Sequence, residues 1–235
     1  MKVLAFNSSP QKDKGNTAMI LNPFLEGLKE AGAEVELLYT RDLNIKPCYG
    51  DFACWLKTPG KCAQKDDMEW IRPKVGQADV VVLATPVYCD GVTGPMKMLM
   101  DRMVPGALPF FEIRDDHTRH PHRDTGKRGK MVLVSSCGLW EKDNFDPMVA
   151  HIQAFCRNAN SKFEGALLRP HGPALRGMLE AGAPVRDVID AAKDAGRQLA
   201  RDGRISSETL STVSRDLMSR EMYMNIVNQY MDQAM

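Results

Sequence analysis

Short apolar runs that alternate with helix-like segments constrain the fold of this chain more than any other feature. The clearest run is ADVVVLATP at 78–86, a continuous stretch that is typical of a strand buried on both faces. Strands that alternate with helices form βαβ units and a parallel sheet. The sequence therefore predicts an α/β fold, a doubly wound sandwich in which ligands bind beyond the carboxyl ends of the strands. The expected strands are residues 2–6, 34–39, 78–86, 130–136 and 163–168.

Helices are expected between these strands, and some of their ends carry recognisable signals. Apolar residues at helical spacing favour a helix over 17–31, in which Pro23 predicts a kink or a late start. Asp66 or Asp67 is expected to cap the helix that follows the second strand. The remaining helices are expected at 67–76, 93–103, 142–158 and 184–202, with an extra tail over 206–235.

Length and charge exclude several classes of protein. The chain has 235 residues, 43% of them hydrophobic, with 31 lysines and arginines against 30 acidic residues. This balance argues against a dedicated nucleic-acid or membrane-surface binder. Six cysteines in a chain of this length do not indicate a secreted disulfide framework. The start of the chain does not resemble a signal peptide, and no apolar run could span a membrane, so a cytoplasmic protein is expected.

The loop NSSPQKDKGNT at 7–17 joins the first strand to the first helix. Free backbone N–H groups and the helix dipole make such a position an anion site. Hydroxyl and amide side chains add neutral donors, and Gly15 lets the backbone approach a ligand closely. The loop matches neither the G-x4-GK[ST] nor the G-x-G-x-x-G pattern, so we expect no separate dinucleotide domain. The alternative is a plain helix cap at Asn16 or Thr17.

Several motifs resemble those of the NADPH-dependent FMN reductase and iron–sulfur flavoprotein group. They are the loop at 7–17, DLNIKPCYGDFACW at 42–55, KDDM at 65–68 and TPVYCDGVTGPMKMLMDR at 85–102. The resemblance covers roughly residues 1–170. It implies a flavodoxin-like, doubly wound five-stranded parallel sheet that binds FMN. The chain would then divide into a flavodoxin-like FMN-binding domain over 1–203 and a helical extension over 204–235.

The resemblance also implies which residues hold the flavin. The phosphate loop of the family typically reads GSPRKNGNT, so Ser9, Asn16 and Thr17 are expected to hold the FMN phosphate. The loops after the third and fourth strands are expected to lie along the isoalloxazine ring. Cys89 stands where the family often has an aromatic residue, which leaves more room beside the ring. The expected cofactor-binding residues are Ser9, Gln11, Gly15, Asn16, Thr17, Pro86, Val87, Tyr88, Ser136, Cys137 and Gly138.

Each of the two ring loops has a simpler interpretation. The segment around Tyr88 could be an ordinary βα turn with a half-buried tyrosine. Cys137 could be a redox thiol, but a buried inert thiol is favoured because nothing nearby in the sequence lowers its pKa.

A second group of residues lies in the loop at 44–65. Cys48, Cys54 and Cys62 occupy three of the four cysteine positions of the cluster-bearing relatives, and Asp51 stands at the fourth. Thiolates suit iron, whereas aspartate is a harder, oxygen ligand. The sequence leaves open a [4Fe-4S] cluster, a labile three-cysteine site, or ordinary thiols in a loop that closes over the flavin or a subunit interface.

Two further segments invite a functional reading. The stretch DDHTRHPHR at 115–123 holds His117, His120 and His122, but it is polar and rich in arginine, including Arg128 just beyond it. We expect a solvated loop or a lid over substrate rather than a metal site. The tail carries an apolar stripe at helical spacing that favours a subunit contact. The stripe consists of Leu217, Met218, Met222, Tyr223, Ile226, Val227, Tyr230 and Met231.

The resemblance implies an FMN-dependent oxidoreductase whose flavin is reduced by NAD(P)H or by a ferredoxin-like electron donor and passes electrons to an unknown acceptor. No protein acid or base is expected. One alternative is an iron–sulfur flavoprotein that carries one or two electrons with a cluster at Cys48, Cys54 and Cys62. The other is a non-enzymatic FMN-binding module. A homodimer or homotetramer is expected, with no nucleic-acid or membrane partner.

Overall fold

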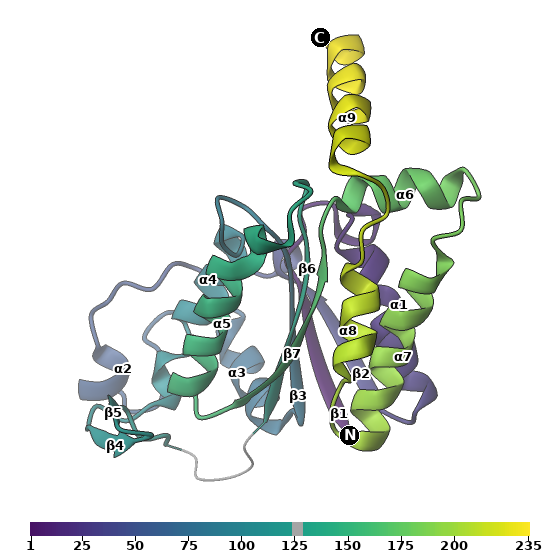
Figure 1. Ribbon diagram of the computed structural model, residues 1–235. Coiled ribbons are helices and arrows are strands. Elements are labelled where there is room, and N and C mark those ends of the chain that lie inside the picture. Colours follow the sequence, from purple (N-terminus) through teal and green to yellow (C-terminus); the bar gives the residue numbers. More distant parts are fainter. Residues whose placement is uncertain (124–128) are drawn as a thin grey trace.

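A five-stranded parallel sheet forms the centre of the protein, as the sequence predicts. The computed structural model describes residues 1–123 and 129–235, and within them the strand order is β2-β1-β3-β6-β7 (Figure 1). Helices cover both faces of this sheet, so the fold is the flavodoxin-like, doubly wound sandwich. The strands are β1 (Lys2–Asn7), β2 (Glu34–Tyr39), β3 (Val80–Pro86), β6 (Lys130–Ser136) and β7 (Lys162–Arg169).

Alternate residues of the strands point to two separate cores. In β1, Val3 and Ala5 pack with the core under α1 and α7, whereas Leu4 and Phe6 pack with the core under α3, α4 and α5. The strands are apolar throughout because both faces are buried. This explains why the strand runs are continuous rather than alternating.

The helices occupy most of the expected positions. Helix α1 runs without interruption through Pro23 and begins at Ala18, so the expected late start is wrong. Asp67 occupies the N-cap position of α3 but its side chain makes no capping bond, and it is Asp66 whose Oδ1 accepts the Met68 N–H at 3.1 Å. The helices are α1 (Ala18–Glu30), α2 (Ala53–Leu56), α3 (Met68–Gln77), α4 (Gly94–Asp101), α5 (Asp146–Asn158), α6 (Gly172–Glu180), α7 (Arg186–Asp202), α8 (Ser207–Ser214) and α9 (Arg220–Ala234).

Helix α2 in the loop at 44–65, helix α6 and a small hairpin were not expected from the sequence. Helix α6 follows β7 directly, and a small antiparallel hairpin, β4 (Glu112–Arg114) with β5 (His117–Arg119), forms within the polar stretch 104–128. Arg128, which we counted with this stretch, lies outside the described residues.

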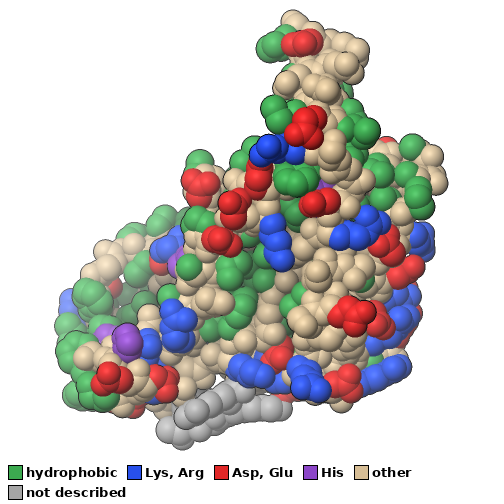
Figure 2. All heavy atoms as spheres, viewed as in Figure 1, with side chains coloured by type: hydrophobic (Ala, Val, Ile, Leu, Met, Phe, Trp, Pro, Cys, Tyr) green, Lys and Arg blue, Asp and Glu red, His purple; other side chains and the backbone are tan. Residues whose placement is uncertain are grey.

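The tail separates into two parts with different surroundings. Helix α8 packs against α7 and β7, whereas α9 projects away from the body beside α6 (Figure 1). Along α9 only Tyr223 is buried, and Met222, Ile226, Tyr230 and Met231 are exposed on the projecting arm (Figure 2). Within the part of the chain that the structure describes, no helix is both long and apolar enough to cross a bilayer.

Candidate functional site

The carboxyl ends of β1, β3, β6 and β7 meet at one edge of the sheet. Asn7 pairs with Ala84, and Pro86 of β3 pairs with Ser136 of β6. The loops that follow these strands are therefore neighbours, although they are far apart in the sequence. This edge gathers the residues that the sequence singled out in three loops.

The loop after β1, residues 8–17, has open hydrogen-bond donors where it meets α1. Among the described residues, the backbone N–H groups of Asn16 and Thr17 have no hydrogen-bond partner. They precede a 13-residue helix, whose dipole adds partial positive charge at the same point. The arrangement attracts an anion.

Gly15 and Asn7 shape this loop. A Cβ atom at Gly15 would overlap the Ser9 Oγ and lie 3.3 Å from the Lys12 carbonyl oxygen, so a larger residue here would displace the Ser9 side chain. The Asn7 side chain is fully buried, and its Oδ1 accepts the Ser9 N–H at 2.9 Å. Its Nδ2 has no partner among the described residues. A buried donor without a partner carries a desolvation cost, which a ligand oxygen at the loop would remove.

Hydroxyl groups connect the loops to one another. Thr17 Oγ1 lies 2.8 Å from Ser136 Oγ, and both side chains are buried. Ser8 Oγ is hydrogen-bonded to Thr93 Oγ1 at the start of α4 and accepts from Thr40 Oγ1 at 3.1 Å. The structure thus brings the expected residues Thr17 and Ser136 together and fixes the loop after β1 against the ends of β3 and β6.

The loop after β3 presents Tyr88 to solvent. The Val87 N–H donates to the Ser136 carbonyl at 3.0 Å, which extends the pairing of β3 and β6 by one step. Tyr88 is 52% exposed, so its ring is accessible to solvent, and this exposure fits both the wall of a site and an ordinary turn with a half-buried tyrosine. The turn is closed by two hydrogen bonds between Tyr88 and Gly91, each 3.0 Å long. Cys89 and Asp90 at its tip both have positive φ, +46° and +62°.

The loop after β6 is anchored from three sides. The Cys137 N–H donates to the Arg169 carbonyl at 3.0 Å, and the Cys137 carbonyl accepts the Gly172 N–H at 2.9 Å. Burial raises the pKa of the Cys137 thiol, which agrees with an inert thiol. Gly138 is exposed, and its carbonyl accepts the Tyr223 hydroxyl at 2.5 Å.

Sequence reasoning missed a buried cluster that attaches the tail to this edge. His171 is fully buried, and its Nε2 accepts from the Leu217 N–H at 3.1 Å and from Arg169 at 3.2 Å. Burial and the neighbouring Arg169 lower the pKa of His171, so the imidazole is neutral. Its ring packs against Trp140 and Tyr223. No local sequence motif indicates this cluster, because its residues come from segments that are distant in the sequence.

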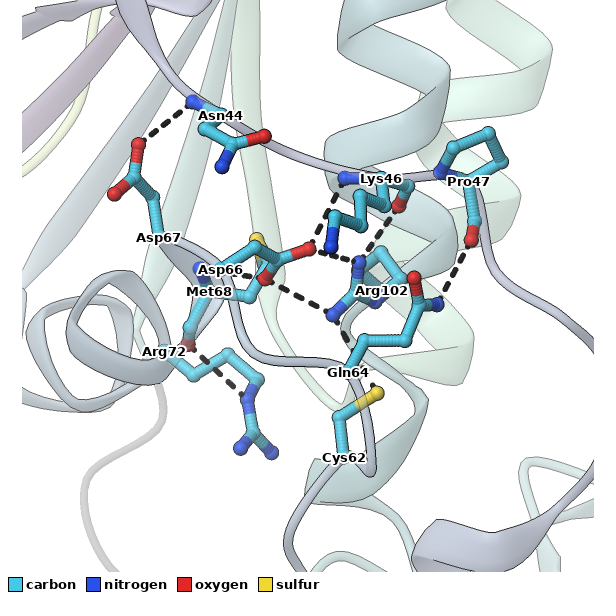
Figure 3. Close-up of polar contacts among 10 residues, drawn as sticks. All are labelled: Asn44, Lys46, Pro47, Cys62, Gln64, Asp66, Asp67, Met68, Arg72 and Arg102. Atoms are coloured by element: carbon cyan, nitrogen blue, oxygen red, sulfur yellow. Dashed lines mark hydrogen bonds and ion pairs between the residues drawn. The ribbon is translucent and has the colours of Figure 1, made fainter.

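The cysteine loop is closed by a buried ion pair (Figure 3). Arg102 and Asp66 are 1% and 0% exposed and are 2.6 Å apart. Arg102 also donates to the Lys46 carbonyl at 2.6 Å and to Cys62 Sγ at 3.4 Å. Burial alone would raise the pKa of Asp66, but hydrogen bonds from Arg102 and from two backbone N–H groups together lower it. The pair holds both arms of the loop, at Lys46 and at Cys62.

The three cysteines of this loop line one small cavity of about 50 Å³, together with Asp51. Asp51 Oδ1 accepts the Ala53 N–H at 3.1 Å and so starts α2. Burial and the nearby Cys62 and Cys48 raise the pKa of Cys54. Within the described residues, no group of three ligating side chains has the geometry to hold a metal ion as it stands.

The stretch with the three histidines lies beside the cysteine loop, away from the loop after β1. His120 packs against Trp55 and Phe111, with ring centroids 4.9 and 5.0 Å apart, and His117 bonds to the Asp115 carbonyl. The expectation of a lid over the carboxyl edge is therefore wrong, because α4 carries the chain to the opposite edge before this stretch begins. A cavity of about 810 Å³ also lies at that opposite edge, lined by residues that include Arg72 and Lys130.

Comparisons with known sequences give a consistent relationship. Residues 1–154 match the sequence model of the NADPH-dependent FMN reductase family. An iron-sulfur flavoprotein of Archaeoglobus fulgidus is 40% identical over 115 residues, 49% of this chain and 55% of the relative. Another, of Methanocaldococcus jannaschii, is 38% identical over 110 residues, 47% of this chain and 55% of the relative. The chain thus spans about half the length of the curated relatives it matches.

Solved structures share the fold. An FMN-dependent NADH-azoreductase of Bacillus anthracis in complex with FMN has a TM-score of 0.61 at 16% identity, covering 85% of this chain and 99% of that one. An NAD(P)H:quinone oxidoreductase of Methanothermobacter marburgensis has a TM-score of 0.59 at 18% identity, covering 85% and 96%. At such low identities these likenesses establish the architecture and nothing finer.

Proposed function

Because this chain belongs to the NADPH-dependent FMN reductase family, we propose that it is an oxidoreductase that binds FMN at the carboxyl edge of its sheet. Residues 8–17 would hold the phosphate. The loops at Pro86–Tyr88 and Ser136–Gly138 would border the isoalloxazine ring. Residues 1–203 would form the flavin-binding domain, and 204–235 the extension.

The observation that carries this proposal is the set of donors left open at the start of α1. Two backbone N–H groups, at Asn16 and Thr17, and the buried Asn7 Nδ2 lack partners among the described residues. Gly15 lets the Ser9 side chain pack directly against the backbone of the loop. Neutral hydroxyl and amide donors suit a phosphate that is bound and not transferred, and FMN carries such a phosphate. The residues present therefore fit the cofactor.

The protein would contribute binding, orientation and access. Bound FMN would supply the redox chemistry, accepting electrons from a donor and passing them to an acceptor. Tyr88, 52% exposed beside the ring position, would limit how a planar donor or substrate stacks there. The Ser136 and Thr17 hydroxyls, 2.8 Å apart, would hold the phosphate loop in register with the ring loops. The family supports NADPH as the electron donor, and assays with candidate acceptors would identify the electron acceptor.

Replacing Asn16 and Thr17 together by alanine should weaken FMN binding at least tenfold, about 1.4 kcal/mol. The double variant loses the Asn16 amide and the Thr17 hydroxyl beside the open N–H groups. Binding can be measured by quenching of flavin fluorescence. A matched control replaces Thr212 and Asn225, which lie on α8 and α9 away from the loop. Unchanged affinity in the Asn16 and Thr17 variant would show that the phosphate binds elsewhere.

A second function is favoured by the cavity that gathers Cys48, Cys54 and Cys62 with Asp51. We propose as the alternative an iron–sulfur flavoprotein that exchanges electrons with a ferredoxin-like partner. Three thiolates would bind iron, and because Asp51 Oδ1 already accepts the Ala53 N–H, ligation by Asp51 would fall to its other carboxylate oxygen. The visible spectrum of anaerobically purified protein, with iron and sulfide assayed on the same sample, separates the two. Flavin bands with stoichiometric iron and sulfide favour the carrier.

Two further points belong to the proposal. A non-enzymatic FMN-binding module would bind FMN, but the bound FMN would not be reduced by NADPH, NADH or reduced ferredoxin under anaerobic conditions.

We also propose a homodimer or homotetramer in which the exposed apolar side chains of α9 are covered by a second copy. Sedimentation of the full chain and of a chain ending at residue 218 would test this, with a smaller species expected from the shorter chain.

A further inference from the structure

Arg176 of α6 contacts the phosphate loop from a part of the chain that lies beyond the family match. Its Nη2 donates to the Lys14 carbonyl at 2.8 Å, and its Nε donates to Asn16 Oδ1 at 3.3 Å. The two partners are separated from Arg176 by about 160 residues of sequence. The matched region ends at residue 154, so nothing in it includes this contact.

Close packing brings α6 to the loop. A Cβ atom on Gly172, the first residue of α6, would lie 3.3 Å from Asn16 Cβ and 3.4 Å from Ser136 Cβ. These distances are tighter than ordinary contacts, so glycine at this position lets the helix approach both loops. Arg176 stands one turn further along the same helix, which directs its side chain back toward the loop.

The contact with Asn16 fixes the orientation of that side chain. An asparagine amide has one acceptor oxygen and two N–H donors. Because Oδ1 accepts from Arg176, the Nδ2 donors face away from the arginine. They are thus free to serve the same ligand as the open backbone N–H groups of Asn16 and Thr17.

The charge of Arg176 is not balanced locally. Among the described residues, no carboxylate forms an ion pair with Arg176. Of the other charged side chains of the loop, Lys12 pairs with Asp42 at 2.5 Å and Asp13 accepts the Tyr39 hydroxyl at 2.6 Å, whereas Lys14 forms no ion pair among the described residues. A half-buried guanidinium beside an anion site, with donors to spare, strengthens that site for a phosphate dianion.

We propose that Arg176 is the positioning and specificity-determining residue of the phosphate subsite, orienting Asn16 and making the site select FMN over riboflavin. The inference rests on the proposed function, since it assigns a role within the same FMN site. The two flavins share the isoalloxazine ring and the ribityl chain and differ only in the phosphate. A residue that acts through the phosphate changes the ratio of their affinities, whereas a residue that only supports the loop changes both.

The test compares FMN and riboflavin binding to flavin-free full-length protein by fluorescence quenching. For Arg176→Gln we expect FMN affinity to fall at least tenfold and riboflavin affinity to change less than twofold. Arg176→Lys keeps the positive charge but loses the planar set of guanidinium donors. Its FMN affinity should therefore lie between those of the wild type and Arg176→Gln. Because salt screens the charge of Arg176, raising the salt concentration should reduce the difference in FMN affinity between the wild type and Arg176→Gln.

The matched control is Arg41→Gln. Arg41 also donates to a loop carbonyl, that of Pro10 at 2.8 Å, but at the far end of the loop and from an exposed position. The Arg41→Gln variant should leave the ratio of FMN affinity to riboflavin affinity unchanged. Equal losses for both flavins in Arg176→Gln, or no loss for FMN, would overturn the inference while the proposed function stands. A wild-type protein that binds neither flavin would overturn both.

Discussion

Replacing Arg102 by methionine should lower the free energy of unfolding by about 3–5 kcal/mol, the usual cost of removing one partner of a buried ion pair. Arg102 makes two hydrogen bonds to Asp66, of 2.6 and 3.1 Å, and further bonds to Lys46 and Cys62. The variant leaves the Asp66 carboxylate buried with only the Lys46 and Met68 N–H groups as donors, at 3.0 and 3.1 Å. For a chain of this size the loss corresponds to a fall of roughly 6–20 °C in Tm.

The loss of unfolding free energy in Arg102→Met should also depend on pH. In the wild type the pKa of Asp66 is lowered, so the contribution of the pair is present above about pH 4 and is lost only as the pH falls further. Without Arg102, burial should raise that pKa above its unfolded value. The folded variant then binds a proton more readily than the unfolded chain and gains stability on acidification. The difference between wild type and variant should therefore be smaller at pH 5 than at pH 8.

Urea unfolding followed by circular dichroism at both pH values measures these differences. Arg186→Met is the control, because its pair with Asp190 is exposed and 3.8 Å long and should contribute less than about 1 kcal/mol. Combining Arg102→Met with Asp66→Asn should cost less than the sum of the two single changes, since no buried charge is then left unpaired. A loss below about 1 kcal/mol for Arg102→Met, equal at both pH values, would refute the reasoning.

Two more predictions concern residues near the carboxyl edge of the sheet. Gly15→Ala should weaken FMN binding at least fivefold with little change in Tm, because the new Cβ would overlap the Ser9 Oγ and displace that side chain within the loop; flavin fluorescence measures the affinity and calorimetry the Tm. The pKa of His171 is lowered by burial and by Arg169, so below about pH 6.5 the unfolded chain binds a proton that the folded protein does not. Stability should fall by up to about 1.4 kcal/mol per pH unit as the pH drops from 6.5, and the slope should vanish in His171→Gln, in urea unfolding between pH 5.5 and 7.5.

The fold was predictable because its signals are local. Each strand of the central sheet is a short apolar run, and the run at 78–86 already predicts a strand buried on both faces, as β3 is. The loop at 7–17 could be recognised for the same reason, since the donors, the glycine and the helix start are neighbours in sequence. Pro23 misled because a proline can lie within a helix whose apolar face is fully packed, as that of α1 is.

The missed features depend on contacts between distant segments. Helix α6 has a glycine–proline start that could have been noticed, but nothing in its sequence shows that Arg176 reaches Asn16. The same holds for Arg102, which the motif at 85–102 includes but whose bond to Cys62 spans 40 residues. The histidine stretch was misjudged because α4 reverses the direction of the chain, which a linear reading does not reveal.

Helix α4 is the element that relates the two candidate sites. At its start Thr93 is hydrogen-bonded to Ser8 of the phosphate loop, and Arg102, just past its end, holds Cys62. Eight helical residues span about 12 Å, so the two sites of one chain lie at opposite ends of a rigid rod. Groups that far apart, with no shared partner, contribute independently to stability and binding. Loss of the cysteine-loop ion pair should therefore leave flavin affinity intact, which would let the role of the cysteine loop be tested separately from flavin binding.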